Sequence, residues 1–395
     1  MKSDTFYNSK ESAVSIILEK EGIRLKEGLN LISTLEGSFS LSGKINLQYQ
    51  LRNYFNQEEN KLSVHRAFVT FNFEKLFLFI GKDNIKVGPS RYGNLLSSTN
   101  PPFYQARIQS KRPLEFFGLL DFTVMYGKFL EDRKDHSDPS LFFIRGDYKP
   151  NRYLEIGINR AVLFGGEGRS SYRIKEYPRV FIGREETLGG RFDNDSYLGY
   201  DVRLNLFFDK LDIFQVYYEN NATDIESPLK KGDPKKLHFP LVLFKFHDNA
   251  QTLGVKVKRG RYLLNWELTN TGKTMYINHN YPVEGLSYKS FVLGYPYGRS
   301  VTHTFLLLSI LDKEVDNHLE VGFIKQPTDI TLPDRFKDYY ITYRINLKRG
   351  KFEISPYIRV DFTENLNYST LPTQFYIKQG STTIYTGGMS IGYLF

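Results

Sequence analysis

Arginine, tyrosine and asparagine side chains gather in three long segments of this sequence that are predicted to be loops. Guanidinium groups bind carboxylates through paired hydrogen bonds, aromatic rings cover the C–H face of a sugar, and amides bond to hydroxyl groups. This mixture suits an anionic polysaccharide, although the same arginines would also suit lipopolysaccharide phosphates or the bracing of loops. The candidate binding residues are Arg91, Tyr92, Asn94 and Arg107 in segment 82–107, Arg169, Arg173, Arg179, Arg184 and Arg191 in segment 164–196, and Tyr276, Tyr281, Tyr288 and Arg299 in segment 271–299.

Catalytic and metal chemistry find little support in the sequence. Glu185 and Glu186 are adjacent, so on a strand they point to opposite faces and cannot flank one glycosidic bond. His303 could be paired with Ser290 or Ser309 as in a hydrolase, but no local signature supports that pair. The seven His residues lack metal-ligand spacing, and the absence of Cys excludes thiol catalysis and disulfides. We therefore expect a chain that is not an enzyme and has no metal or cofactor.

The C-terminal stretch indicates which elements must position these loops. Tyr385, Met389, Ile391, Tyr393 and Phe395 fall on alternate positions, with small or polar residues between them. That period of two is typical of a strand with one apolar face. A final strand that ends on an aromatic residue favours an outer-membrane barrel, in which the last strand closes against the first. We expect its partner strand near residues 36–55, and we expect the barrel-assembly machinery to recognise this C-terminal strand.

Other segments repeat this alternation, with apolar residues on one side and charged residues on the other. The clearest hairpin runs through 339–347 and returns through 352–362 around Gly350. Short turns alternate with long connections along the chain, as they do in porin-like barrels. We count 18 antiparallel strands if 241–247 and 286–295 are strands, and 16 if each lies in a loop.

The composition agrees with a barrel better than with a helical membrane protein. Aromatic residues make up 15% of the chain, yet the mean hydropathy is negative and no run approaches the ~20 apolar residues of a spanning helix. A barrel has a polar lumen, so a hydrophilic average is expected. The net charge of +9 predicts a basic lumen or basic loops that meet an anionic partner. Nucleic acid is not that partner, because the chain has no basic tail or nucleic-acid module.

The first 33 residues differ from the rest and are predicted to be a separate N-terminal segment, 1–33. Residues 10–21 show roughly helical spacing before Gly22, so we expect one short helix in a periplasmic or plug region. Residues 34–395 are then the transmembrane barrel, a monomer that crosses the outer membrane many times. No signal-peptide core follows Met1, so the export signal that such a protein needs is absent from this chain.

Residues 81–113 carry a resemblance to a known family. Its marks here are Gly81-Lys82, Gly88-Pro89, Leu95-Leu96-Ser97 and Pro102-Phe103. Three further stretches follow in the family's order, at 155–169, 194–203 and 266–298. Together they resemble the Wzi-type capsule assembly family over about 36–395. Lys82 stands where the family usually has Arg, and Lys86-Val87 where it tends to have Trp, so any stacking of that Trp on sugar is lost.

The resemblance implies an 18-stranded outer-membrane barrel that acts as a lectin, not an enzyme, and helps to retain capsular or exopolysaccharide at the cell surface. Two other functions stay open from the residues alone. A soluble β protein would need no membrane, and a diffusion porin would select anionic solutes with a basic lumen. The luminal residues of such a porin would be Arg203, Lys256, Lys258, Arg344 and Arg359.

Overall fold

The computed structural model describes residues 2–8, 21–23, 25–115, 117–170, 172–177, 194–226, 245–326, 336–367 and 377–393. Strands dominate this part of the chain, and within it no helix is both long and apolar enough to cross a membrane. The elements are β1 (Lys2–Asn8), β2 (Gly28–Ser42), β3 (Ile45–Phe55), β4 (Asn60–Asn72), β5 (Leu76–Asp83), β6 (Phe103–Ser110), β7 (Leu114–Glu115), β8 (Leu119–Lys128), β9 (Ser140–Lys149), β10 (Leu154–Phe164), η2 (Ile174–Glu176), β11 (Asp195–Phe208), β12 (Leu211–Glu226), β13 (Lys245–Arg259), β14 (Tyr262–Thr271), β15 (Ser287–Tyr288), β16 (Phe291–Val292), β17 (Thr302–Ile310), β18 (Val315–Gln326), β19 (Phe336–Arg349), β20 (Phe352–Asn367) and β21 (Ile377–Tyr393).

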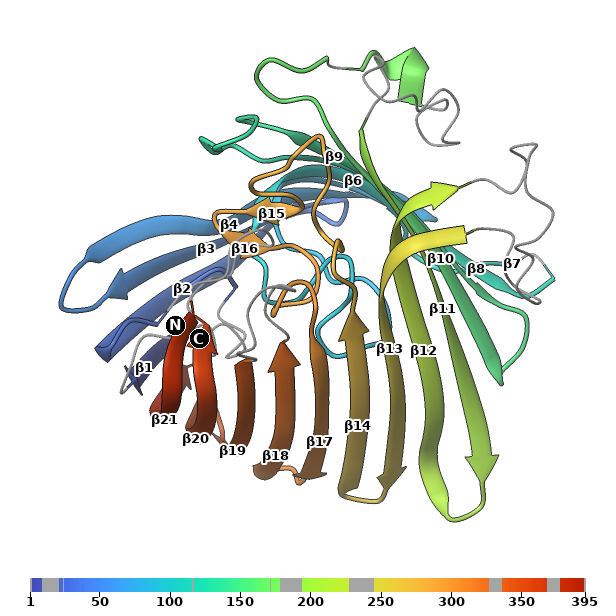
Figure 1. Cartoon of the computed structure of the whole chain (residues 1–395). Helices are drawn as coiled ribbons and strands as arrows, with labels where there is room; N and C mark the ends of the chain where they lie inside the picture. The colour runs from blue at the N-terminus through green and yellow to red at the C-terminus, as the bar shows by residue number, and fades with distance from the viewer. Residues whose placement is uncertain are drawn as a thin grey trace.

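The long strands form one antiparallel barrel of 18 strands (Figure 1). Each pairs with its neighbour in the chain, except that β6 pairs with β8 and β14 with β17. The barrel closes through β1, which pairs with β21 on one side and with β2 on the other. The expected partner of the last strand, near residues 36–55, is therefore wrong.

The N-terminal strand was not predicted from the sequence because Lys2–Asn8 is short and mostly polar. Since β1 and β2 both belong to the barrel sheet, the barrel includes residues on both sides of position 34. The helix predicted over 10–21 lies outside the described residues, apart from Glu21. Leu394 and Phe395 lie outside them too.

The predicted number of strands is confirmed, but two of the segments behind it are corrected. Segment 286–295 contributes only the small hairpin β15–β16, which lies within the connection between β14 and β17. Of segment 241–247, residues 245–247 are the start of β13, and 241–244 lie outside the described residues. The count still reaches 18 because β1 supplies a strand that the alternation did not reveal.

Apolar side chains face outward and charged ones face inward, as the alternation predicted. Tyr385, Met389 and Ile391 on β21 are 54%, 42% and 41% exposed. Asp201 and Asp361, on β11 and β20, are fully buried inside the barrel. A lipid-facing wall and a polar interior explain how an aromatic-rich chain has a negative mean hydropathy.

The two ends of the barrel differ in the length of their connections. Turns 43–44, 209–210, 260–261 and 350–351 lie at the end that also holds the start of β1 and the end of β21. The opposite end carries the long connections, among them 84–102, 129–139 and 272–301. We call it the long-loop end; in outer-membrane barrels the longer loops face the outside.

Candidate functional site

Residues 84–102, which we call the luminal loop, leave the rim of the barrel and cross its interior. They connect β5 to β6, yet their tip contacts side chains of β12, β14 and β18. Val87, Tyr92, Leu95 and Leu96 of this loop are all 3% exposed or less. The luminal loop is therefore part of the interior packing, whereas we had expected an external surface there.

Two buried carboxylates on the far wall hold the tip of the luminal loop by its backbone. Glu219 on β12 accepts hydrogen bonds from the backbone N–H of Ser90 (3.2 Å) and of Asn94 (2.8 Å), and from the Ser90 hydroxyl (2.6 Å). Glu267 on β14 accepts one from the backbone N–H of Arg91 (2.8 Å). A carboxylate that accepts several N–H groups satisfies its own buried lone pairs and fixes the path of the loop.

Arg91 adds a third attachment, to β18. Its guanidinium forms an ion pair with Glu320, which also accepts a hydrogen bond from the Tyr340 hydroxyl (2.8 Å). The guanidinium also lies 5.4 Å from the ring centroid of Tyr92 and 5.5 Å from that of Phe305. These contacts neutralise a mostly buried pair of charges and leave little of Arg91 for a ligand.

Gly88 lets the luminal loop approach the wall closely. Its φ is +89°, a conformation that side-chain-bearing residues rarely adopt. A Cβ atom at this position would lie 2.2 Å from Oε2 of Glu219. The Gly88-Pro89 pair that stood out in the sequence therefore marks the point where the loop docks on β12.

Residues 272–301, which we call the capping loop, pack onto the luminal loop. The Tyr276 hydroxyl donates to the carbonyl oxygen of Asn94 (2.6 Å) and accepts from the backbone N–H of Tyr295 (3.0 Å). The backbone N–H of Ser97 donates to the carbonyl oxygen of Leu293 (2.8 Å). Two of the stretches that carry the family resemblance are thus one packing unit, which explains why both are rich in Gly and Tyr.

Arg133 braces the capping loop from the β8–β9 connection, and sequence reasoning missed it. Its side chain is fully buried and donates to the carbonyl oxygens of Gly285 (2.7 Å) and Ser287 (2.8 Å). It also lies 2.9 Å from Asp135 and 3.3 Å from Glu131. The charge-rich run 131–135 was the available signal, but such a run is usually a solvated surface.

The pKa values of these two acids shift in opposite directions. Burial raises the pKa of Glu131 to about 7, although the nearby Arg133 opposes this rise. Burial also works against ionisation of Asp135, but its hydrogen bond to Arg133 and the charge of that residue outweigh burial and lower the pKa. Asp135 is therefore the firmer anchor for Arg133, whereas Glu131 changes its charge near neutral pH.

The predicted binding residues divide by depth. Tyr92, Asn94, Tyr281 and Tyr288 are buried, each 1% exposed or less. Arg91 and Arg107 are partly buried inside the barrel, where the Arg107 guanidinium lies 4.5 Å from the ring centroid of Phe79. Three of them, on connections at the long-loop end, are at least partly exposed to solvent: Arg169, Arg173 and Arg299. Arg179, Arg184 and Arg191 lie outside the described residues.

Two of the buried tyrosines serve as supports for charged residues above them. The Tyr281 hydroxyl donates to the carbonyl oxygen of Gly165 (2.8 Å), and the Arg169 guanidinium lies 5.3 Å from the ring centroid of Tyr281. The Tyr288 ring stacks on Phe129 with 5.3 Å between centroids, while the Lys289 amine lies 5.3 Å from the Tyr288 centroid. Each ring therefore positions a cation at the long-loop end.

The nominated Ser–His pair around His303 does not form. His303 is buried and contacts the hydroxyls of Tyr295 and Tyr340. Ser309 instead lies 2.8 Å from Nδ1 of His318 and is only 3% exposed, too little for a nucleophile that must reach a substrate. Within the described residues, no group of three or more His, Asp or Glu could hold a metal ion.

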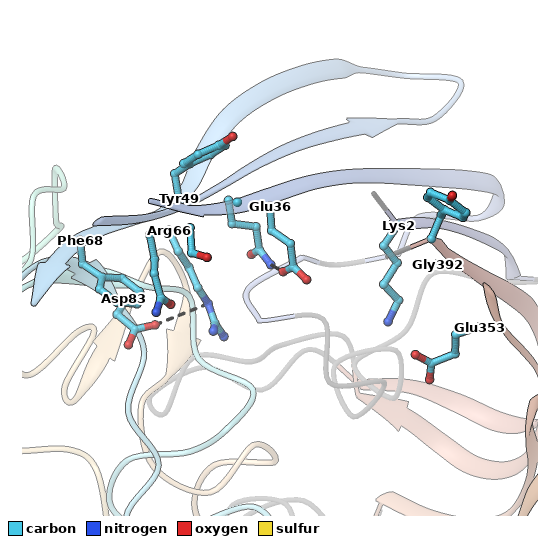
Figure 2. A pocket seen from close by; sticks show the side chains of 13 residues that line it. Lys2, Glu36, Tyr49, Arg66, Phe68, Asp83, Glu353 and Gly392 are labelled. Atoms are coloured by element: carbon cyan, nitrogen blue, oxygen red, sulfur yellow. Dashed lines mark hydrogen bonds and ion pairs between the residues drawn. The ribbon is translucent and has the colours of Figure 1, made fainter. Parts of the chain in front are cut away.

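A cavity of about 720 Å³ lies inside the barrel, beside the strands on both sides of the closing strand β1 (Figure 2). Its charged lining residues are Lys2, Glu36, Arg66, Asp83 and Glu353. Glu36 accepts a hydrogen bond from Gln50 (3.1 Å), and Arg66 lies 3.5 Å from Asp83 (Figure 2). Cations and carboxylates are mixed around this cavity, so its lining suits water or hydroxyl groups better than a simple anion.

A second interior cavity, of about 390 Å³, is lined by Lys256 and Arg344, two of the basic residues that would line the lumen of a diffusion porin. Two others are committed to acids: Arg203 pairs with Glu155, and Nε of Arg359 donates to Asp361 (2.8 Å). Two of the five cations assigned to a porin lumen are therefore neutralised by acids of the wall.

Comparisons with known proteins agree with this architecture. The family model described as capsule assembly protein Wzi matches residues 9–321. The structure is similar to Wzi from Escherichia coli, described as an outer membrane protein involved in group 1 capsule assembly and a carbohydrate-binding beta-barrel. The TM-score is 0.72 and the identity 12%, over 100% of this chain and 84% of that one. It is also similar to Pseudomonas aeruginosa OpdL (TM-score 0.55, 8% identity, covering 99% and 96%) and OprD (0.55, 10%, 99% and 93%). A search of curated proteins finds no match.

Proposed function

The chain belongs to the Wzi family of capsule assembly proteins, and we propose that it is an outer-membrane lectin, not an enzyme. In this proposal its long-loop end binds capsular or exopolysaccharide and helps to hold the polymer at the cell surface. The observation that carries the proposal is the luminal loop, which Glu219, Glu267 and Glu320 fix across the lumen. A barrel crossed by a fixed loop presents a shaped surface rather than a free passage for solutes.

Three predicted arginines supply the cationic part of this proposed surface: Arg169, Arg173 and Arg299. They lie on connections at the long-loop end and keep part of their side chains exposed. The buried Tyr92, Asn94, Tyr281 and Tyr288 act as supports in this proposal, because they lie beneath the surface that a polymer could reach. Arg91 and Arg107 stabilise the interior, and a role for Arg191 stays a prediction.

A diffusion porin is supported less well. The luminal loop occupies the path that solutes would take, and its tip is tied to three strands of the opposite wall. Arg203 and Arg359, which would select anions, are paired with acids. The similarity to OpdL and OprD follows from the barrel fold and is weaker than the similarity to Wzi.

The remaining partners follow from the location. We propose that the outward apolar residues contact outer-membrane lipid and that lipopolysaccharide surrounds the long-loop end. The barrel-assembly machinery would recognise β21, the last strand of the described barrel. Because the described strands close into a barrel through β1, the barrel sheet that they form has no open edge, and we propose that the protein acts as a monomer.

Deleting the gene in a capsule-bearing strain tests the proposed function. We expect cell-associated polymer to fall while polymer in the medium rises, because attachment rather than synthesis or secretion is lost. Chemical assay of polymer in washed cells and in the medium measures both fractions. The wild-type gene should restore attachment, and a variant with Arg169→Ala, Arg173→Ala and Arg299→Ala should restore less. Normal cell-associated polymer in the deletion strain would contradict the proposal.

A further inference from the structure

A cavity of about 340 Å³ at the long-loop end is lined by far more positive than negative charge. Five cationic side chains line it, and two carboxylates, Glu21 and Glu59, do so too. Glu21 is already committed, because it accepts contacts from Arg52 (3.3 Å), His65 (2.9 Å) and Arg66. Among the described residues, the lining of the cavity therefore keeps an excess of positive charge.

Three lysines from separate elements carry this excess. Lys61 lies at the start of β4, Lys82 near the end of β5, and Lys289 on the capping loop, and all three line the cavity. No carboxylate in the described part of the chain forms an ion pair with any of the three amines. The Lys82 amine donates to the carbonyl oxygen of Val64 (2.7 Å), which leaves it two further N–H groups. We call this site the three-lysine pocket.

The protein holds these like charges together at a cost. Burial, and then the charge of Lys61, lower the pKa of Lys289, although Glu131 acts in the opposite direction. Glu131 does not neutralise the amine; its carboxylate accepts the backbone N–H of Lys289 instead. Amines that repel one another are stabilised when an anion binds among them, so the arrangement favours an anionic ligand.

The turn that carries Lys289 is strained. Lys289 and Ser290 link β15 to β16 and have φ values of 50° and 63°. Two-residue turns of this kind normally use Asn and Gly, because other residues resist positive φ. Strain of this sort concentrates at functional positions. The Tyr288 ring beneath the Lys289 amine, with 5.3 Å between amine and ring centroid, helps to keep the lysine at the cavity.

We infer that the three-lysine pocket binds the carboxylate of an acidic sugar residue in the polysaccharide. The lysine amines supply several N–H donors to that carboxylate, while Phe291, Pro101 and Pro102 supply an apolar face for the C–H side of the sugar ring. The cavity volume suits one sugar residue of a polymer. This inference rests on the proposed function and adds the ligand chemistry and the place where it binds.

Binding measurements on the detergent-solubilised full chain test the inference. The probes are the capsular polysaccharide of the strain that carries the protein and the same polymer after chemical reduction of its carboxyl groups. We expect reduction to weaken binding to the wild type by about tenfold, the loss of one charge-assisted contact. We expect Lys82→Gln with Lys289→Gln to weaken binding of the native polymer to the same extent. Reduction should then cause little further loss in this variant.

The controls separate the possible outcomes. Lys44→Gln with Lys75→Gln removes two exposed charges at the opposite end of the barrel and should bind as the wild type does. Heat-modifiable migration should confirm that every variant is folded. Unchanged binding of the native polymer by the Lys82/Lys289 variant would overturn this inference but not the proposed function. The same holds if the variant loses binding only to lipopolysaccharide, added as a competitor, and not to the polymer. Failure of the wild type to bind either polymer would overturn the proposed function together with it.

Discussion

At the residue scale, Gly88 allows the luminal loop to lie against the opposite wall of the barrel. The close approach of its backbone to Glu219 allows that carboxylate to reach the N–H groups of Ser90 and Asn94. Any side chain at position 88 would have to displace either the loop or the carboxylate. The attachment of the loop to β12 therefore depends on the absence of a Cβ atom at one position.

We predict that Gly88→Ala destabilises the protein, whereas Gly43→Ala does not. The strain of a positive φ alone costs a non-glycine residue roughly 1–2 kcal/mol, and the contact with Glu219 adds to it. Gly43 is a matched control because a Cβ there meets nothing within 4 Å. The temperature at which heat-modifiable migration is lost measures both effects. Equal transition temperatures for the two variants would show that the loop does not depend on Gly88.

The partners of Gly88 show what sequence reasoning could not reach at this scale. Gly88 and Pro89 stand out in the sequence because their backbone preferences are local. Glu219, Glu267 and Glu320 each look like an ordinary charged residue of an alternating strand. They gather around one loop only because barrel closure places β12, β14 and β18 opposite β5 and β6. The burial of Tyr92 and Tyr281 could not be predicted for the same reason. An aromatic residue in a loop can either contact a ligand at the surface or pack beneath it.

At the element scale, β1 decides whether the barrel is closed. It pairs residue for residue with both β2 and β21, so each of its backbone groups meets a partner strand. Strong alternation made the long strands predictable, as in the hairpin of β19 and β20. Strand β1 was not predictable, because seven mostly polar residues give no clear period and residues 9–20 separate it from the rest.

We predict that Thr5→Pro impairs closure of the barrel, whereas Thr5→Val does not. Thr5 pairs with Leu31 on β2 and with Met389 on β21. Proline removes a ladder hydrogen bond from a strand that is paired on both sides, while valine keeps the backbone donor and favours strands. The fraction of protein that shows heat-modifiable migration in outer-membrane preparations measures assembly. Normal assembly of the proline variant would mean that β21 closes against another strand.

At the scale of the whole molecule, the barrel and its two interior loops give one consistent arrangement. The apolar exterior suits lipid, and the interior ion pairs suit a filled lumen. Lys61, Lys82 and Lys289, which form no ion pair with a carboxylate of the described residues, gather at the long-loop end. The period-two alternation, read from the sequence, was enough to predict a barrel with a polar inside. It could not show that a loop fills part of that inside, because alternation describes the wall and not what crosses the lumen.

Shortening the luminal loop tests whether that loop keeps the lumen closed. The backbone N–H of Val87 donates to the carbonyl oxygen of Leu96 (3.0 Å), so the loop is narrow at this point and residues 88–95 can be replaced by Gly-Gly. We predict that the wild type gives no steady large channels in planar bilayers and that the shortened variant gives steady channels. Removing the tip takes away Arg91 and uncovers the carboxylates of Glu219, Glu267 and Glu320 beside Lys256 and Arg344, so these channels should not prefer anions. Gly43→Ala, which leaves the loop intact, should stay closed. Steady conductance in the wild type would favour the porin alternative, and a closed shortened variant would show that other segments seal the lumen.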